Sequence, residues 1–120
     1  MKKNILVVEN EVVIADDICL RLKKLDYQVL EPALTYRQAL HSVNNELPDL
    51  VFIDLRLTGK KTGIDLARYI LKNSNIPFVF ITACSDSASM KEINQLKPLA
   101  CLNKAFSTAL LAKTMESAWI

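Results

Sequence analysis

The run from Leu50 to Asp54 constrains the fold more than any other stretch of this chain. Its first four residues are apolar, Pro48 precedes it, and a loop containing Gly59 follows it. A short unbroken apolar run bounded by turn residues is typical of a strand buried on both faces, as in parallel sheets. Such a strand ends by placing one carboxylate, Asp54, at its tip, where an acid is costly unless it is used or paired.

Further apolar runs predict four more strands, and helix-periodic segments separate them. The expected strands are Asn4–Val8, Tyr27–Leu30, Leu50–Asp54, Ile76–Ile81 and Leu99–Leu102. The expected helices cover 11–25, 36–45, about 63–73, a segment starting at 85–87, and 105–119, with Asn10 and Thr35 as N-caps of the first two. Strict alternation of apolar strands and helices predicts an α/β fold, a doubly wound parallel sheet covered on both faces.

Composition and charge exclude several classes of protein. With 120 residues, 51% hydrophobic and 23% charged, the chain is expected to form a single domain over residues 1–120. A net charge of +2 without long basic runs gives no sign of direct nucleic-acid binding. No stretch is long enough to span a membrane, and the apolar run before Glu9 is too short for a signal peptide. Three cysteines without metal-ligand spacing favour reduced thiols and a cytoplasmic location.

Polar side chains stand where the predicted strands end. Glu9 and Asn10 follow the first strand, Asp54 ends the third, Thr82 follows the fourth and Lys104 follows the fifth. In open parallel sheets, ligands bind beyond the carboxyl ends of the strands, so these side chains are expected to share a site. Mg²⁺ takes few protein oxygens together with water and phosphate oxygens. With such an ion, Asp54 is a candidate nucleophile that forms an aspartyl-phosphate, while Lys104 supplies positive charge and Thr82 a hydrogen bond.

Over essentially its whole length, the sequence resembles the receiver domain of two-component response regulators. The matching motifs occur in the expected order and spacing: 5–11 (ILVVENE), 49–57 (DLVFIDLRL), 63–67 (GIDLA), 77–83 (PFVFITA) and 102–106 (LNKAF). The resemblance implies a flavodoxin-like (βα)5 fold with strand order 2-1-3-4-5. It also implies a switch that catalyses only its own phosphorylation and dephosphorylation, and not a metabolic enzyme.

The resemblance also implies a role for each position. Asp54 corresponds to the phosphoacceptor, Thr82 follows the phosphoryl group, and Lys104 pairs with it. Glu9 and Asn10 occupy the positions that hold Mg²⁺ together with Asp54 and the backbone carbonyl of Arg56. The implied donor is a sensor histidine kinase or a phosphotransfer protein. The implied output is to an effector domain or partner, through the face formed by the fourth helix, fifth strand and fifth helix.

Three departures from the family pattern bear on function. Asn10 replaces an acid, which predicts weaker Mg²⁺ binding. Cys101 stands at the switch position, where the family has an aromatic ring that reports phosphorylation, so another side chain or the 83–85 loop must carry the signal. Ala105 replaces the usual proline after Lys104, and a cis bond before alanine costs about 2.5–4 kcal/mol. In addition, Thr58 stands where most of the family has a proline.

Other interpretations of the sequence remain open. A degenerate receiver, acting as a constitutive protein-interaction module with weak or no phosphorylation, would account for Asn10, Cys101 and Ala105. A haloacid-dehalogenase-like phosphatase needs a second aspartate where Arg56 stands, and an FMN-binding flavodoxin would not place acids after its first strand. Cys84 and Cys101 are expected to be unreactive thiols. Apolar residues of the last two helices are expected in the core, and any left exposed would form a partner surface: Met90, Ile93, Leu110, Leu111, Met115 and Trp119.

Overall fold

The computed structural model describes residues 2–57, 59–83 and 87–119, and its centre is a parallel sheet. The sheet has five strands in the order β2-β1-β3-β4-β5, which confirms the fold class expected from the sequence. The strands are β1 (Asn4–Val8), β2 (Gln28–Val29), β3 (Leu50–Asp54), β4 (Phe78–Thr82) and β5 (Ala100–Asn103). The run from Leu50 to Asp54 is the middle strand and has neighbours on both sides.

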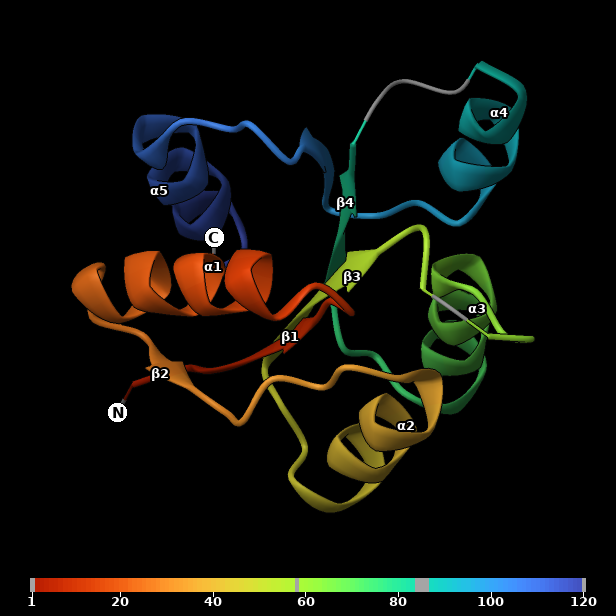
Figure 1. The fold of residues 1–120 in the computed structure, drawn as a ribbon, viewed down its shortest axis with the longest axis horizontal. Helices are drawn as coiled ribbons and strands as arrows, with labels where there is room; N and C mark the ends of the chain where they lie inside the picture. The colour runs from red at the N-terminus through yellow and green to blue at the C-terminus, as the bar shows by residue number, and fades with distance from the viewer. Residues whose placement is uncertain (1, 58, 84–86, 120) are drawn as a thin grey trace.

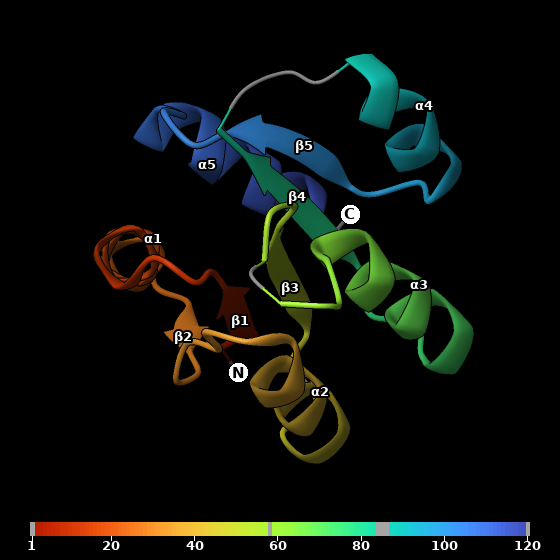
Figure 2. The ribbon, with the colours of Figure 1, turned by 45° about the vertical axis from the view of Figure 1, so that its right-hand side comes forward.

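Two layers of helices cover the sheet (Figures 1 and 2). One face carries α1 (Val12–Lys24) and α5 (Thr108–Ser117). The opposite face carries α2 (Tyr36–Asn45), α3 (Gly63–Asn73) and α4 (Ser87–Gln95). No helix among the described residues has the length and apolar character needed to cross a bilayer.

Each central strand contributes side chains to two hydrophobic cores, one on each face of the sheet. Val51 and Ile53 pack with the α2–α3–α4 side, whereas Leu50 and Phe52 pack with the α1–α5 side. Successive strand residues point to opposite faces, so a strand covered on both faces must be apolar throughout. This requirement explains the unbroken apolar runs, because burial of each large side chain stabilises the fold by roughly 1.5–3 kcal/mol.

The structure corrects two expected helix starts. Thr35 caps α2 as expected, since its hydroxyl accepts a hydrogen bond from the Gln38 amide. Asn10, however, is not the N-cap of α1: Glu11 holds that position, and its side chain makes no capping bond. Helix α5 begins at Thr108, three residues later than expected, because residues 103–106 form a hydrogen-bonded turn after β5.

Most of the expected apolar residues of the last two helices are buried or half-buried. Leu111 and Met115 are fully buried, and Ile93 almost so, but Leu110 is 43% exposed, so its expected burial is wrong. The expected helix start at Ser85 and Asp86, and the proline position at Thr58, lie outside the described residues.

Candidate functional site

The register of the sheet brings the polar strand ends to one edge. Val8 pairs with Ile53, so Glu9 follows β1 level with Asp54 at the end of β3. On the other side, Thr82 of β4 pairs with Asn103 of β5, and Lys104 follows directly. The chain order therefore becomes a spatial cluster because parallel strands share the direction in which they end.

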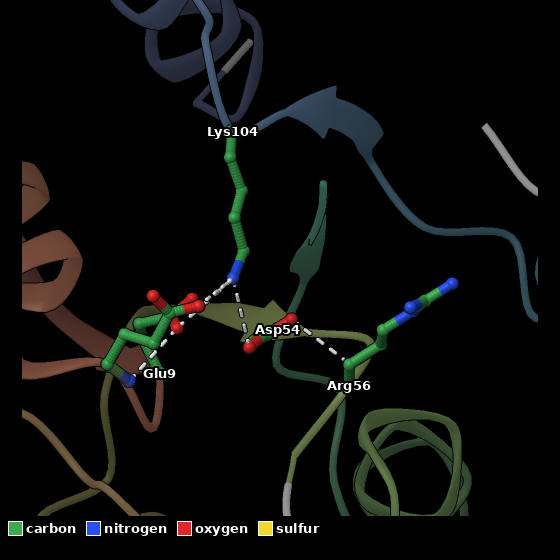
Figure 3. A network of polar contacts seen from close by, with 5 residues as sticks. Glu9, Asp54, Arg56 and Lys104 are labelled. Atoms are coloured by element: carbon green, nitrogen blue, oxygen red, sulfur yellow. Dashed lines mark hydrogen bonds and ion pairs between the residues drawn. The ribbon is translucent and has the colours of Figure 1, made fainter. Parts of the chain in front are cut away.

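Asp54 is the buried acid at the centre of this edge. Its Oδ1 accepts a hydrogen bond from the backbone N–H of Arg56 at 3.0 Å. Its Oδ2 lies 3.4 Å from Nζ of Lys104. The carboxylate thus has one contact from the backbone that follows β3 and one from the Lys104 side chain (Figure 3).

The Lys104 ammonium connects three carboxylates. Its Nζ lies 3.2 Å from Oε1 of Glu9, 3.3 Å from Oε1 of Glu11 and 3.4 Å from Oδ2 of Asp54. Figure 3 shows the lysine side chain extending from the β5 side to the space between Glu9 and Asp54. Burial lowers the pKa of Lys104, but these carboxylates raise it more, so the net pKa lies above the ordinary lysine value.

Glu9 is fully buried, and within the described residues only one of its carboxylate oxygens has hydrogen-bond partners. Oε1 accepts from the Glu11 amide at 3.1 Å and from Lys104. Oε2 is the buried side-chain oxygen that lacks a hydrogen-bond partner within the described part of the chain. Burial raises the pKa of Glu9, and the charge of Asp54 raises it further; the Glu11 amide and Lys104 oppose this without cancelling it.

These residues fit a hard divalent cation that takes few protein ligands. Mg²⁺ prefers oxygen donors and is commonly held by one or two carboxylates, with water and phosphate oxygens completing the shell. Glu9 and Asp54 supply two carboxylates at one edge of the sheet. Oε2 of Glu9 accepts no hydrogen bond from the described residues, so its lone pairs are available to coordinate a cation. Among the described residues, no cluster of three or more histidines, cysteines and acids forms a dedicated metal cage.

The other expected site residues are Thr82, Asn10 and Cys101, and each has a different environment. The Thr82 carbonyl accepts from the backbone N–H of Lys104 at 2.8 Å, so these two residues are joined through the backbone. Asn10 is half-buried between Glu9 and the start of α1. Cys101 lies within β5 opposite Phe80 and packs, half-buried, on the α2–α3–α4 side. Burial raises the pKa of its thiol, which disfavours the reactive thiolate.

Two backbone features of the site bear on expectations from the sequence. The peptide bond between Lys104 and Ala105 is trans, as are the others in the described ranges. The 83–85 loop, one expected carrier of the signal, is described only at Ala83. Cys84, expected to be an unreactive thiol, likewise lies outside the described residues.

Sequence reasoning missed two residues of the site. Glu11 was expected only as the first residue of a helix, yet its carboxylate contacts Lys104. Gly63 begins α3 so close to β3 that a Cβ there would stand 2.2 Å from the Asp54 carbonyl oxygen. The second acid of Glu9-Asn10-Glu11 is a sequence signal that could have identified Glu11, whereas the role of Gly63 depends on how α3 packs.

Comparison with known proteins identifies the family. The response regulator receiver domain family matches residues 5–116, and the chain belongs to that family. It is a receiver domain of two-component systems. Receiver domains of response regulators interact with histidine kinases and with effector domains.

Individual relatives show the same relationship. The chain is 38% identical over 92 residues to the uncharacterized transcriptional regulatory protein YrkP of Bacillus subtilis, covering 77% of this chain and 38% of YrkP. It is 28% identical over 116 residues to the transcriptional regulatory protein PdtaR of Mycobacterium tuberculosis, covering 97% and 56%. The chain thus spans about 38–56% of the length of these relatives.

Solved structures agree with this assignment. The N-terminal domain of a response regulator/sensory box/GGDEF three-domain protein from Carboxydothermus hydrogenoformans superposes with a TM-score of 0.87 at 32% identity, covering 97% of this chain and 93% of that one. The receiver domain of NtrX from Brucella abortus gives a TM-score of 0.87 at 28% identity, covering 95% and 96%.

Proposed function

We propose that this domain accepts a phosphoryl group on Asp54, with Mg²⁺ as cofactor, and thereby switches its interactions in two-component signal transduction. The observation that carries the proposal is the convergence of Glu9 and Asp54 on one ammonium, with a buried oxygen of Glu9 that has no hydrogen-bond partner among the described residues. In this proposal the domain catalyses only its own phosphorylation and dephosphorylation and acts in the cytoplasm.

The chemical step is a displacement at phosphorus. An Asp54 carboxylate oxygen forms the new P–O bond while the P–N bond of a phosphohistidine breaks, and the bonding electron pair stays on the histidine nitrogen. The donor is a sensor histidine kinase or a phosphotransfer protein. Lys104 offsets the negative charge of the transferred group, and the Thr82 hydroxyl donates a hydrogen bond to it.

Glu9 and Asp54, with Asn10 and the Arg56 carbonyl, would hold the cation. Bound there, Mg²⁺ neutralises phosphoryl oxygens and orients the donor. The Asn10 amide supplies an oxygen but no charge, so we propose weaker Mg²⁺ binding than two acids would give. Lys104 has a role in both states of the domain. Its ammonium pairs with the carboxylates in the free domain and is close enough to pair with the phosphoryl group after transfer.

Intact-mass spectrometry with acetyl phosphate and Mg²⁺ tests the proposal. We expect a phosphoryl adduct on the native chain and none on Asp54→Asn, which keeps the size of the side chain but lacks the nucleophilic oxygen. Lys104→Ala should take up phosphate more slowly. An absent adduct, or an adduct that persists in Asp54→Asn, would contradict the proposal. An absent adduct together with undetectable Mg²⁺ binding would instead favour a constitutive interaction module.

Signal output is proposed to pass through the face of α4, β5 and α5. Leu110 supports this assignment, because it is an exposed apolar side chain on α5. Cys101 lies on β5, and its side chain is too small to sweep the volume of an aromatic ring. Moving a two-state domain from 1:99 to 99:1 takes about 5.5 kcal/mol, which displacement of the Thr82 and Lys104 backbones by the phosphoryl group would have to supply.

A further inference from the structure

The turn after β5 carries Lys104 into the site, and its conformation is closely held. The Ala105 N–H donates to Oδ1 of Asn103 at 2.9 Å, which forms an Asx turn around Lys104. The Phe106 N–H donates to the Asn103 carbonyl at 2.9 Å. A proline at position 105 would have no N–H, so the first of these bonds requires a residue other than proline there.

Arg21 holds the far end of the same turn from another element. Its Nη1 donates to the Phe106 carbonyl at 2.8 Å, and its guanidinium lies 5.1 Å from the centre of the Phe106 ring. Asp17, one turn earlier on α1, pairs with the guanidinium at 3.0 Å and fixes its direction. A hydrogen bond from a charged donor is stronger than a neutral one, and the stacked ring adds to it.

Lys104 lies between these two anchors. Its long side chain must bring one ammonium to within 3.2–3.4 Å of three carboxylates, which requires its backbone to be held in place. The Asx turn fixes the backbone on the β5 side, and Arg21 fixes it on the α5 side. Among the described residues, the side chains of Asn103 and Arg21 make their hydrogen bonds and ion pair to the turn and to Asp17, and none to the carboxylates of the site.

We infer that Arg21 and Asn103 are positioning residues that aim Lys104 at Glu9 and Asp54. Helix α1 begins beside Glu9 and contacts the Lys104 turn through Arg21, so one helix joins both halves of the site. The inference rests on the proposed role of Lys104 in phosphoryl transfer. It also predicts that loosening the turn affects the site through Lys104 alone.

A double-mutant cycle with two readouts tests the inference. The first readout is the rate constant for phosphorylation by acetyl phosphate at saturating Mg²⁺, and the second is the Kd for Mg²⁺ from calorimetry. Arg21→Met and Asn103→Ala are each measured with Lys104 present and in a Lys104→Ala background. Arg21→Lys keeps the charge without the planar fork. Lys24→Met removes one positive charge from an exposed position of the same helix and serves as the matched control.

We expect Arg21→Met and Asn103→Ala to slow phosphorylation about tenfold, and Arg21→Lys to restore part of the rate. Mg²⁺ should bind about threefold more tightly, because a misplaced ammonium competes less well for Glu9 and Asp54. Both effects should fall below twofold in the Lys104→Ala background, and Lys24→Met should match the native chain. A purely structural role would instead weaken Mg²⁺ binding and slow phosphorylation whether or not Lys104 is present.

The outcomes separate this inference from the proposed function. Normal phosphorylation of the native chain with unchanged rates and Kd in both variants would overturn the positioning role and leave the proposed function intact. Equal losses in both backgrounds would also overturn it. If the native chain binds Mg²⁺ but takes up no phosphoryl group, the proposed function fails, and the Mg²⁺ cycle still decides the positioning role. A native chain that does neither overturns both.

Discussion

Gly63 is the position where one added carbon should disturb phosphorylation most directly without touching the site's side chains. A Cβ there would stand 2.2 Å from the carbonyl oxygen of Asp54 and 3.0 Å from both the carbonyl carbon of Asp54 and Cγ2 of Ile53. The clash is with backbone at the end of the central strand, so no side-chain rotation relieves it. Gly63→Ala must therefore move either the start of α3 or Asp54 itself.

The size of the effect follows from that distance. The oxygen must retreat by at least about 0.8 Å to reach 3.0 Å, a separation that Cβ contacts in real structures essentially never go below. Forcing extra volume into a packed region costs about 1–3 kcal/mol. A misplacement near 1 Å can cost about 100-fold in rate. We therefore expect Gly63→Ala to lower the free energy of unfolding by about 2 kcal/mol and the rate of Asp54 phosphorylation by roughly 100-fold.

Gly59 provides the matched control for this substitution. Within the described part of the chain, and apart from its chain neighbours, no atom lies within 4 Å of a Cβ built there, but its φ of 108° is strained for any other residue. Gly59→Ala should therefore cost about 1–3 kcal/mol of stability through backbone strain. It should leave the phosphorylation rate within about threefold, since it displaces nothing at Asp54. Urea denaturation and intact-mass kinetics on both variants separate the two effects. Near-native phosphorylation in folded Gly63→Ala would refute the reasoning.

Three further predictions concern the charges of the site. Because the folded-state pKa of Glu9 is raised, its contribution to stability is present below the unfolded pKa near 4.5 and is lost as pH rises through the folded value. Glu9→Gln should thus raise the urea midpoint at pH 7 while weakening Mg²⁺ binding, and an unchanged midpoint would count against the burial penalty. Asn10→Asp should tighten Mg²⁺ binding about tenfold, equivalent to ~1.4 kcal/mol, in calorimetry, whereas equal affinity would show that Asn10 is not the weak point. Because the pKa of Lys104 is raised in the folded state, its contribution to stability is present below the unfolded value near 10.5 and is lost as pH rises through the folded value. Lys104→Met should remove this loss of stability at alkaline pH in urea denaturation. A loss that persists in the variant would show that another group causes it.

The elements of the fold follow from local patterns. The apolar run of β3, its counterparts in β1 and β4, and the periodic helices between them identify an alternating α/β chain, because burial on one or two faces dictates which residues are apolar. The ends of helices were less predictable. The late start of α5 and the cap of α1 depend on the turn around Lys104 and on the use of the Glu11 side chain by Lys104, and neither leaves a periodic signal.

The chemical groups at the carboxyl ends of the strands can be read from the sequence alone: Glu9, Asp54, Thr82 and Lys104. Strand direction and the chain order suffice for that, since parallel strands end at a common edge. How these groups are held depends on contacts between elements that are far apart in the sequence. Glu11 joins Lys104 across 93 residues of sequence, Arg21 reaches the Phe106 carbonyl across 85, and Gly63 brings α3 against Asp54. These contacts depend on the rotation and packing of whole helices, which local spacing does not encode.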